Sequence, residues 1–132
     1  MTFELLSLVG VVGVLFLLLM FQGALVPLHH GFGWGLGSRV DARQLTVMQG
    51  RARRTIANHL EGMAMFAPLV IILHLADIST SVTVWGAGLF LVSRIAFALM
   101  YLGGVPVLRS VFWGASIAGL LMIAFPLIKA GL

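Results

Sequence analysis

The sequence predicts an all-α integral membrane protein built as a four-helix bundle. Hydrophobic residues make up 61% of its 132 residues, mean hydropathy is +1.12, and charged residues make up only 9%, against roughly 25% in soluble domains. A chain this short has a large surface for its volume, which eight basic and four acidic side chains could not keep in water. The length therefore allows one domain, residues 1–132, and the composition excludes a soluble monomer.

The first expected span covers residues 5–28, which carry no charge. At about 1.5 Å per residue, this run is long enough to cross a hydrocarbon core of roughly 30 Å. It lacks the pattern of a secretory signal peptide, because Glu4 precedes it instead of Lys or Arg and because it exceeds an h-region of about 7–15 residues. We therefore expect a transmembrane helix.

Three further runs predict three further helices. Residues 55–76 and residues 82–102 each contain a single charge, and residues 110–129 carry one only at their last position. Runs this long, without strand-like alternation, exclude a transmembrane barrel. Helices remain, because only helices and closed barrels satisfy every backbone group in lipid.

Polar and glycine-rich segments separate these spans. Alternating glycines around two aromatic residues in 31–37 predict a flexible interfacial loop, because no βαβ unit surrounds them as a dinucleotide site requires. Residues 40–54 contain good helix formers and no proline, so we expect them to lead helically into the second span. The later breaks are a turn at 77–81 and the group Gly103, Gly104 and Pro106.

Basic residues are concentrated in the first and third connections. These arginines are Arg39, Arg43, Arg51, Arg53 and Arg54, with Arg109 before the fourth span. The 77–81 turn has none, and the C-terminal tail has only Lys129. By the positive-inside rule, both connections face the cytoplasm and both termini lie outside it, which we assign to a bacterial inner membrane. We interpret the cluster as a topology signal that also touches lipid headgroups, not as a nucleic-acid site, because no soluble domain presents it.

Four polar residues share one face of the second span, here called the polar face: Arg51, Arg54, Asn58 and Glu61. Their spacing of i, i+3, i+7 and i+10 places them within roughly an 80° sector, about 15 Å long. An ionisable group in a span costs about 2.5–3.5 kcal/mol on insertion scales. One interpretation is internal pairing of Arg54 with Asn58 and Glu61. A functional site is the other, and it is favoured because a buried pair rarely gains more than its desolvation costs.

The third span repeats this pattern, because Arg94, Phe97 and Tyr101 share a face at i, i+3 and i+7. Arg94 is expected near mid-membrane and needs an acidic or carbonyl partner, and Glu61 is the carboxylate expected at that depth. Tyr101 equally fits an interfacial aromatic belt, and Arg109 fits a snorkelling anchor at the membrane edge.

Several chemistries are excluded or disfavoured. The chain has no cysteine, so a disulfide scaffold, a thiolate zinc site and a cysteine nucleophile are excluded. The histidines, His29, His30, His59 and His74, are either adjacent or several turns apart, which does not suit a metal site. No serine has a histidine and a carboxylate at the spacing that a nucleophilic triad needs.

Three motifs resemble the MAPEG family, the membrane-associated proteins in eicosanoid and glutathione metabolism. The first is RARRTIANHLE from Arg51 to Glu61, followed by FAPL at 66–69, and all four positions of the polar face match it. The second is SRIAFALMYLG at 93–103 and the third is PVLRSV at 106–111. Together they cover about residues 51–112, and the chain is identified as a bacterial-type member that resembles microsomal glutathione transferases.

The resemblance implies a homotrimer that binds glutathione as a co-substrate in cytoplasm-facing pockets between subunits, with no metal. Arg54, Asn58, Glu61 and Tyr101 match family residues that hold glutathione, and Arg94 matches a residue that supports the same pocket. Arg109 matches the arginine that faces the thiol in catalytic members, and Ser110 matches its neighbour in some of them.

The chemistry of glutathione agrees with this assignment. Its two carboxylates suit guanidinium groups and its ammonium suits an acid, which Arg51, Arg54 and Glu61 offer. Lowering a thiol pKa of ~8.5 by two units needs ~2.7 kcal/mol of thiolate-selective stabilisation, which one shielded arginine can supply. The thiolate would then attack a lipophilic electrophile that enters from the membrane.

The chain departs from the family at several positions, each of which removes a polar contact. Phe97 stands where eicosanoid enzymes often carry Tyr or His, Gly62 where some members carry Tyr, and Ile56 where a polar residue can reach a neighbouring subunit's ligand. The family's arginine at the end of the first span has no clear counterpart. The residues that could substitute for it are His29, His30 and Arg39. These departures argue against an eicosanoid product.

We therefore expect a detoxifying glutathione transferase or peroxidase that acts on lipophilic electrophiles in the bilayer. The alternative is a non-catalytic lipid- or glutathione-binding scaffold of the same family, which Phe97 and Gly62 favour. A small four-span drug/proton exporter is a third hypothesis, because such transporters have a similar length and one membrane acid. Their acid lies in the middle of the first span, whereas Glu4 precedes the first span here.

Overall fold

The computed structural model describes residues 1–38 and 44–131, and these residues form helices joined by short connections. The helices are α1 (Phe3–His30), α2 (Phe32–Leu36), α3 (Val47–Leu75), α4 (Ser81–Leu102) and α5 (Pro106–Gly131). All but α2 are long and apolar enough to cross a membrane, by length and composition. The prediction of an all-α fold with four membrane-crossing helices is confirmed.

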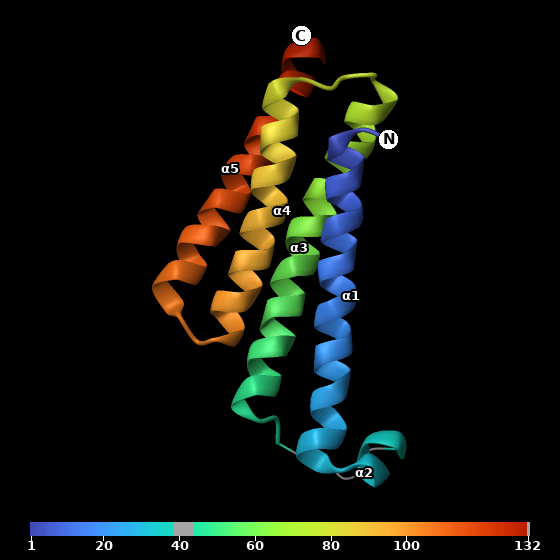
Figure 1. Ribbon diagram of the computed structural model, residues 1–132, viewed down its shortest axis with the longest axis vertical. Helices are drawn as coiled ribbons and strands as arrows, with labels where there is room; N and C mark the ends of the chain where they lie inside the picture. The colour runs from blue at the N-terminus through green and yellow to red at the C-terminus, as the bar shows by residue number, and fades with distance from the viewer. Residues whose placement is uncertain (39–43, 132) are drawn as a thin grey trace.

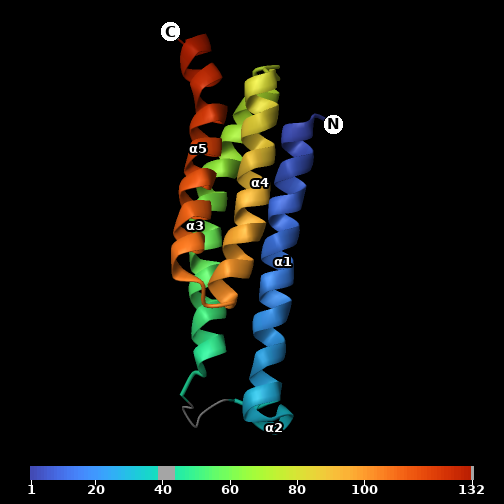
Figure 2. The ribbon, with the colours of Figure 1, turned by 60° about the vertical axis from the view of Figure 1, so that its left-hand side comes forward.

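The four long helices lie side by side and run antiparallel to their chain neighbours (Figure 1). One end of the bundle, here the connection end, holds α2 and the turn between α4 and α5. The other, here the terminal end, holds both chain termini and the turn between α3 and α4 (Figures 1 and 2). Helix α4 packs along α5 as a hairpin, and α3 contacts α1, α4 and α5. Side chains on α3 can therefore meet side chains from three other helices.

Local capping determines where the long helices begin. Thr46 and Gln49 form a capping box at the start of α3, in which each side chain bonds the other residue's backbone N–H at 3.2 and 2.8 Å. Thr80 and Thr83 do the same at the start of α4. Pro106 is the first residue of α5, where its missing N–H costs nothing.

Two predictions for the first connection were wrong in part. Residues 32–36 form the short helix α2 instead of a flexible loop. The helical lead into the second span begins only at Val47, because Thr46 caps the helix there, and residues 44–46 are not helical. Arg39, Arg43 and the remainder of the 40–43 segment lie outside the described residues. The predicted break at Gly103 and Gly104 is confirmed, and Gly104 has the positive φ of 74° that favours glycine.

Aromatic stacking and close helix contact form the core. The rings of Phe66 on α3 and Phe90 on α4 stack at 4.2 Å between centroids with 6° between planes, and both are fully buried. Helices α4 and α5 touch at Gly86 and Gly119, where a Cβ on Gly119 would lie 2.7 Å from the Gly86 carbonyl oxygen. Glycine is therefore required at this crossing, as expected for small residues between membrane helices.

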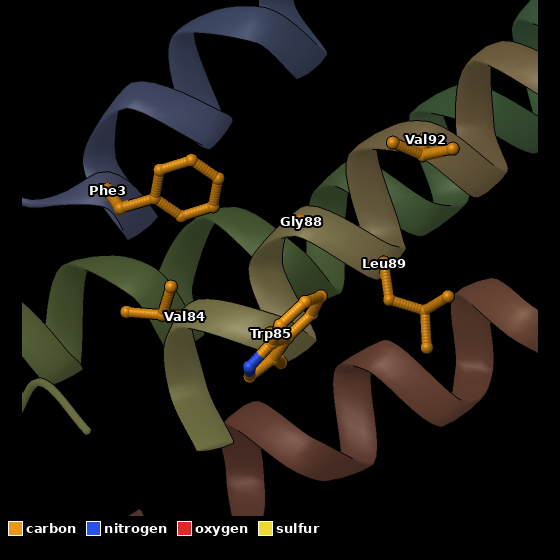
Figure 3. A pocket seen from close by; sticks show the side chains of 6 residues that line it. All are labelled: Phe3, Val84, Trp85, Gly88, Leu89 and Val92. Atoms are coloured by element: carbon orange, nitrogen blue, oxygen red, sulfur yellow. The ribbon is translucent and has the colours of Figure 1, made fainter. Parts of the chain in front are cut away.

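The outer surface is largely apolar, which suits a bilayer environment. A hollow of about 460 Å³ on this surface lies between the start of α1 and α4 (Figure 3). The residues that line it are Phe3, Val84, Trp85, Gly88, Leu89 and Val92. No charged side chain lines it, so it suits acyl chains or an apolar protein contact and offers nothing to a polar ligand.

A buried carboxylate joins α1 to the turn between α3 and α4. Glu4 is 2% exposed, and its Oε1 accepts hydrogen bonds from Ser79 Oγ at 3.0 Å and from Thr83 Oγ1. Hydrogen bonds to a carboxylate are about twice as strong as bonds between neutral groups. Glu4 therefore fixes the terminal end of α1 to the rest of the bundle.

We predict that Glu4→Ala lowers the free energy of unfolding by about 1.5–3 kcal/mol, because the buried Thr83 hydroxyl and the Ser79 hydroxyl lose a charged acceptor. Thermal unfolding of the protein in detergent measures this change. The control is Asp77→Asn, which removes an exposed charge at the same end and keeps a residue type that tolerates the positive φ of 53° there. Equal melting temperatures for Glu4→Ala and the unmodified protein would contradict the prediction.

Candidate functional site

The polar face of α3 meets α4 and α5 towards the connection end. Arg54 and Glu61 are exposed, while Arg51 and Asn58 are half-buried. Their hydrogen-bond partners come from α4, and Arg109 at the start of α5 lies against one of these partners, Tyr101. The candidate site is therefore built from three helices and not from one.

Tyr101 of α4 is the point where these helices meet. Arg54 of α3 donates from Nε to the Tyr101 hydroxyl at 3.0 Å. The guanidinium carbon of Arg109, on α5, lies 4.6 Å from the centroid of the Tyr101 ring, within the range of a cation–π contact. Two predicted site residues of like charge are thus held near one phenol, where an anionic group would offset their repulsion.

Arg94 supports this group from inside the bundle. It is 2% exposed, donates from Nη2 to Asn58 Oδ1 at 2.9 Å, and places its guanidinium carbon 4.6 Å from the centroid of the Phe97 ring. The hydrogen-bond partner is the side-chain carbonyl of Asn58, so of the two kinds of partner expected from the sequence, acidic or carbonyl, the structure shows the carbonyl and not the Glu61 carboxylate. Among the interactions of the described residues, no hydrogen bond joins Arg94 to Glu61. Phe97 therefore replaces a polar contact with a cation–π contact.

The alternative of internal pairing along α3 is not observed. Arg54 is hydrogen-bonded to Tyr101 and Asn58 to Arg94, and both partners lie on α4 instead of α3. Among the described residues no ion pair within 4 Å involves Glu61. Its carboxylate is exposed and remains open to a positively charged group.

A small cavity of about 100 Å³ adjoins Arg94 between α3, α4 and α5. Its polar lining comes from Asn58, Glu61, Arg94, Trp113 and Ser116. Gly62 contributes the space, because a Cβ there would lie 3.4 Å from the Phe90 ring and 3.7 Å from the Arg94 guanidinium. The cavity can hold about three waters, or one small polar group, at ~30 Å³ each.

Other predicted residues lie apart from this group. Arg51 donates from Nη1 to the Leu102 carbonyl at 3.4 Å and lies against Gly104, so it braces the α4–α5 turn. Ser110 donates to the Pro106 carbonyl at 3.1 Å within its own helix. His30 pairs with Gln49 at 3.0 Å, and Arg39 lies outside the described residues.

Sequence reasoning gave His59 no role in the site, although it lies beside the polar face. Its side chain is 1% exposed and its Nε2 lies 2.9 Å from the Val11 carbonyl oxygen on α1. The available signal was an ionisable ring inside a span, next to Asn58. Across residues 1–38 and 44–131, no cluster of three His, Asp or Glu side chains could hold a metal ion.

Comparison with known proteins agrees with this architecture. The family model described as the MAPEG family matches residues 6–128, nearly the whole chain. A search of curated proteins found no match. The matched residues include α3 and α4 completely, all but the outer ends of α1 and α5, and every residue of the candidate site. The chain belongs to the MAPEG family of membrane proteins.

Proposed function

We propose that this protein is a glutathione-dependent transferase or peroxidase that acts on lipophilic electrophiles inside the bilayer. The observation that carries the proposal is the meeting of Arg54, Tyr101 and Arg109, from three helices, around one phenol ring. Beside them lies a cavity that Asn58 and Arg94 help to line. A set of cations and hydrogen-bond donors at the connection end suits an anionic ligand that approaches from water.

The charges of glutathione match these side chains one by one. Its carboxylates suit the guanidinium groups of Arg54 and Arg51, which can donate two parallel hydrogen bonds. Its ammonium suits Glu61, whose carboxylate is exposed beside the same face. Arg94 holds Asn58 by its oxygen, which leaves the amide N–H groups free to donate to the peptide.

Arg109 is proposed as the group that stabilises the thiolate. It is half-buried, and its guanidinium is held at the Tyr101 ring, close to the membrane edge where a lipophilic substrate enters. A hydrogen bond from a cation lowers the thiol pKa because it favours the charged form. The thiolate sulfur then forms a bond to the electrophilic carbon, and the leaving group departs with the electron pair of its bond. With a hydroperoxide, the thiolate sulfur forms a bond to the terminal peroxide oxygen, the O–O bond breaks, and the alkoxide that leaves takes a proton to become the alcohol. The glutathione sulfenic acid that results condenses with a second glutathione, which gives the disulfide and water.

We further propose a homotrimer in a bacterial inner membrane, with both termini outside the cytoplasm. Supporting this orientation, the connection end carries Arg51, Arg53, Arg54 and Arg109, whereas Lys129 is the basic residue near the terminal end. Supporting the assembly, large apolar hollows remain on the outer faces of α1, α3, α4 and α5. Site residues such as Arg54 and Glu61 are also exposed in one chain, so a neighbouring subunit could complete the site.

A non-catalytic scaffold that binds glutathione or lipid is the second candidate. The observation that favours it is Phe97, whose ring centroid lies 4.6 Å from the Arg94 guanidinium carbon at a position where the family resemblance implies a polar side chain in eicosanoid enzymes. The two functions separate in one pair of measurements. Binding of glutathione by calorimetry without turnover of any electrophile would select the scaffold, whereas turnover would select the enzyme.

We predict that Arg109→Ala lowers glutathione conjugation to 1-chloro-2,4-dinitrobenzene by about 10- to 100-fold, because the thiolate loses its donor; this is somewhat less than the loss of an oxyanion-hole donor. The measurement is kcat/KM in detergent or nanodiscs. Arg53→Ala is the matched control, since Arg53 is an exposed arginine of α3 outside the group around Tyr101. An unchanged rate in Arg109→Ala would remove Arg109 from this role.

We predict that Tyr101→Phe weakens glutathione binding by about 3- to 10-fold, because Arg54 loses its hydroxyl partner while the ring under Arg109 stays. Isothermal titration calorimetry measures the dissociation constant, and KM should rise more than kcat falls. Trp85→Phe, on the apolar outer surface, serves as control. Affinity that does not differ between the two variants would show that the hydroxyl does not orient Arg54 for the ligand.

A further inference from the structure

His59 is held in one tautomer by a backbone carbonyl in the middle of α1. Its Nε2 lies 2.9 Å from the Val11 carbonyl oxygen, and a carbonyl can only accept a hydrogen bond. Nε2 therefore carries the proton, and Nδ1 of the neutral ring is left as an acceptor. Nδ1 is fully buried and has no hydrogen-bond partner. An unpaired buried acceptor costs about 1–3 kcal/mol, so a partner is expected.

Arg94 presents the complementary atom. Its Nη2 donates to Asn58 Oδ1 and its ring contact is with Phe97, but its Nε–H is fully buried without a partner. Nε can only donate. Of the four buried side-chain atoms that lack partners in the described part of the chain, these two are one acceptor and one donor within the middle of the bundle.

The two side chains lie near each other. His59 directly follows Asn58, the residue to which Arg94 is hydrogen-bonded, so the two side chains leave their helices at the same level of the bundle. Gly62 lies one turn further along α3, and its missing side chain leaves space beside the Arg94 Nε, 3.7 Å from where a Cβ would stand. Gly62 also lines the cavity that Asn58 and Arg94 line, so open volume adjoins the Arg94 side chain at this turn of α3.

We propose that one buried water joins Arg94 Nε–H to His59 Nδ1, which makes His59 a positioning residue for the candidate site. The water accepts from Nε and donates to Nδ1, so both unpaired atoms are satisfied at once. Arg94 is then fixed through Asn58, Phe97 and the water-linked ring, and α1 is joined to the site through the Val11 carbonyl.

The consequence for function rests on the proposed binding of glutathione. A guanidinium fixed at Nε cannot rotate away from Asn58, so the Asn58 amide keeps its oxygen on Arg94 and its N–H groups towards the ligand. His59 never touches the ligand in this account. It acts on affinity through Arg94 and has no part in the chemical step.

Two substitutions of His59 separate the two ring nitrogens. Gln reaches about as far as Nε2, so His59→Gln keeps a donor for the Val11 carbonyl and loses the acceptor at Nδ1. Asn reaches about as far as Nδ1, so His59→Asn keeps that acceptor and loses the bond to α1. His74→Gln, on the exposed end of the same helix, is the control.

We expect His59→Gln to raise the glutathione dissociation constant and KM about 3- to 10-fold with little change in kcat, as for loss of one hydrogen bond. His59→Asn should bind glutathione within about twofold of the unmodified protein but melt at a lower temperature. Equal effects of both variants on affinity, or no effect of His59→Gln, would overturn the proposal. If the unmodified protein binds no glutathione, the proposed function fails, and the pairing is then judged by spectroscopy.

Nitrogen NMR of labelled histidine in the unmodified protein tests the pairing without any ligand and without relying on the folding of a variant. The proposal predicts that Nδ1 of His59 is unprotonated and has the shift of a nitrogen that accepts a hydrogen bond. Arg94→Lys, which lacks Nε, should move that signal towards the value of an unbonded nitrogen. An unbonded Nδ1 in the unmodified protein would overturn the proposal.

Discussion

The structure depends on how it accommodates one buried cation, the Arg94 guanidinium, in the middle of a membrane bundle. A charged group at this depth must be paired, because lipid offers no hydrogen bonds. Asn58 and the Phe97 ring share this task, and the partners come from α3 and α4. The contacts of Arg94 therefore pack α3 against α4 and, at the same time, orient the polar face. Glu61 is exposed, because Arg94 is hydrogen-bonded to Asn58 and not to the Glu61 carboxylate.

The two ends of the bundle differ in how their charged side chains are partnered and exposed. At the terminal end, Oε1 of Glu4 accepts hydrogen bonds from two hydroxyl groups, which fixes α1, and the carboxylate is buried inside the bundle. At the connection end, cations from α3 and α5 are gathered around Tyr101 and remain partly accessible. Between the ends, stacked Phe66 and Phe90 form a dry core. This separation of a closed end from an open end is what a site for a charged ligand beside a bilayer requires.

The helices and the polar face could be predicted from sequence, because charge-free length and a period of 3.6 residues are local properties of the chain. The hydrogen-bond partners of the polar side chains could not be predicted from the sequence. Arg51 bonds the Leu102 carbonyl and His59 bonds the Val11 carbonyl, and a backbone acceptor far along the chain leaves no residue signature. Helix α2 was missed because its glycines have low intrinsic propensity, so its formation depends on tertiary contacts with α1. The site residues themselves stay predictions until ligand binding is measured.

Native mass spectrometry of the particle released from detergent, with and without glutathione, measures whether three chains assemble and whether their polar faces bind the tripeptide. The account predicts a particle of three 14.2 kDa chains that gains up to three glutathione masses at millimolar ligand. It also predicts that Glu61→Gln and Arg54→Ala particles of the same size gain fewer. An unmodified particle that retains no glutathione would contradict the claim that this polar face holds the tripeptide. So would variant particles that retain as much glutathione as the unmodified protein.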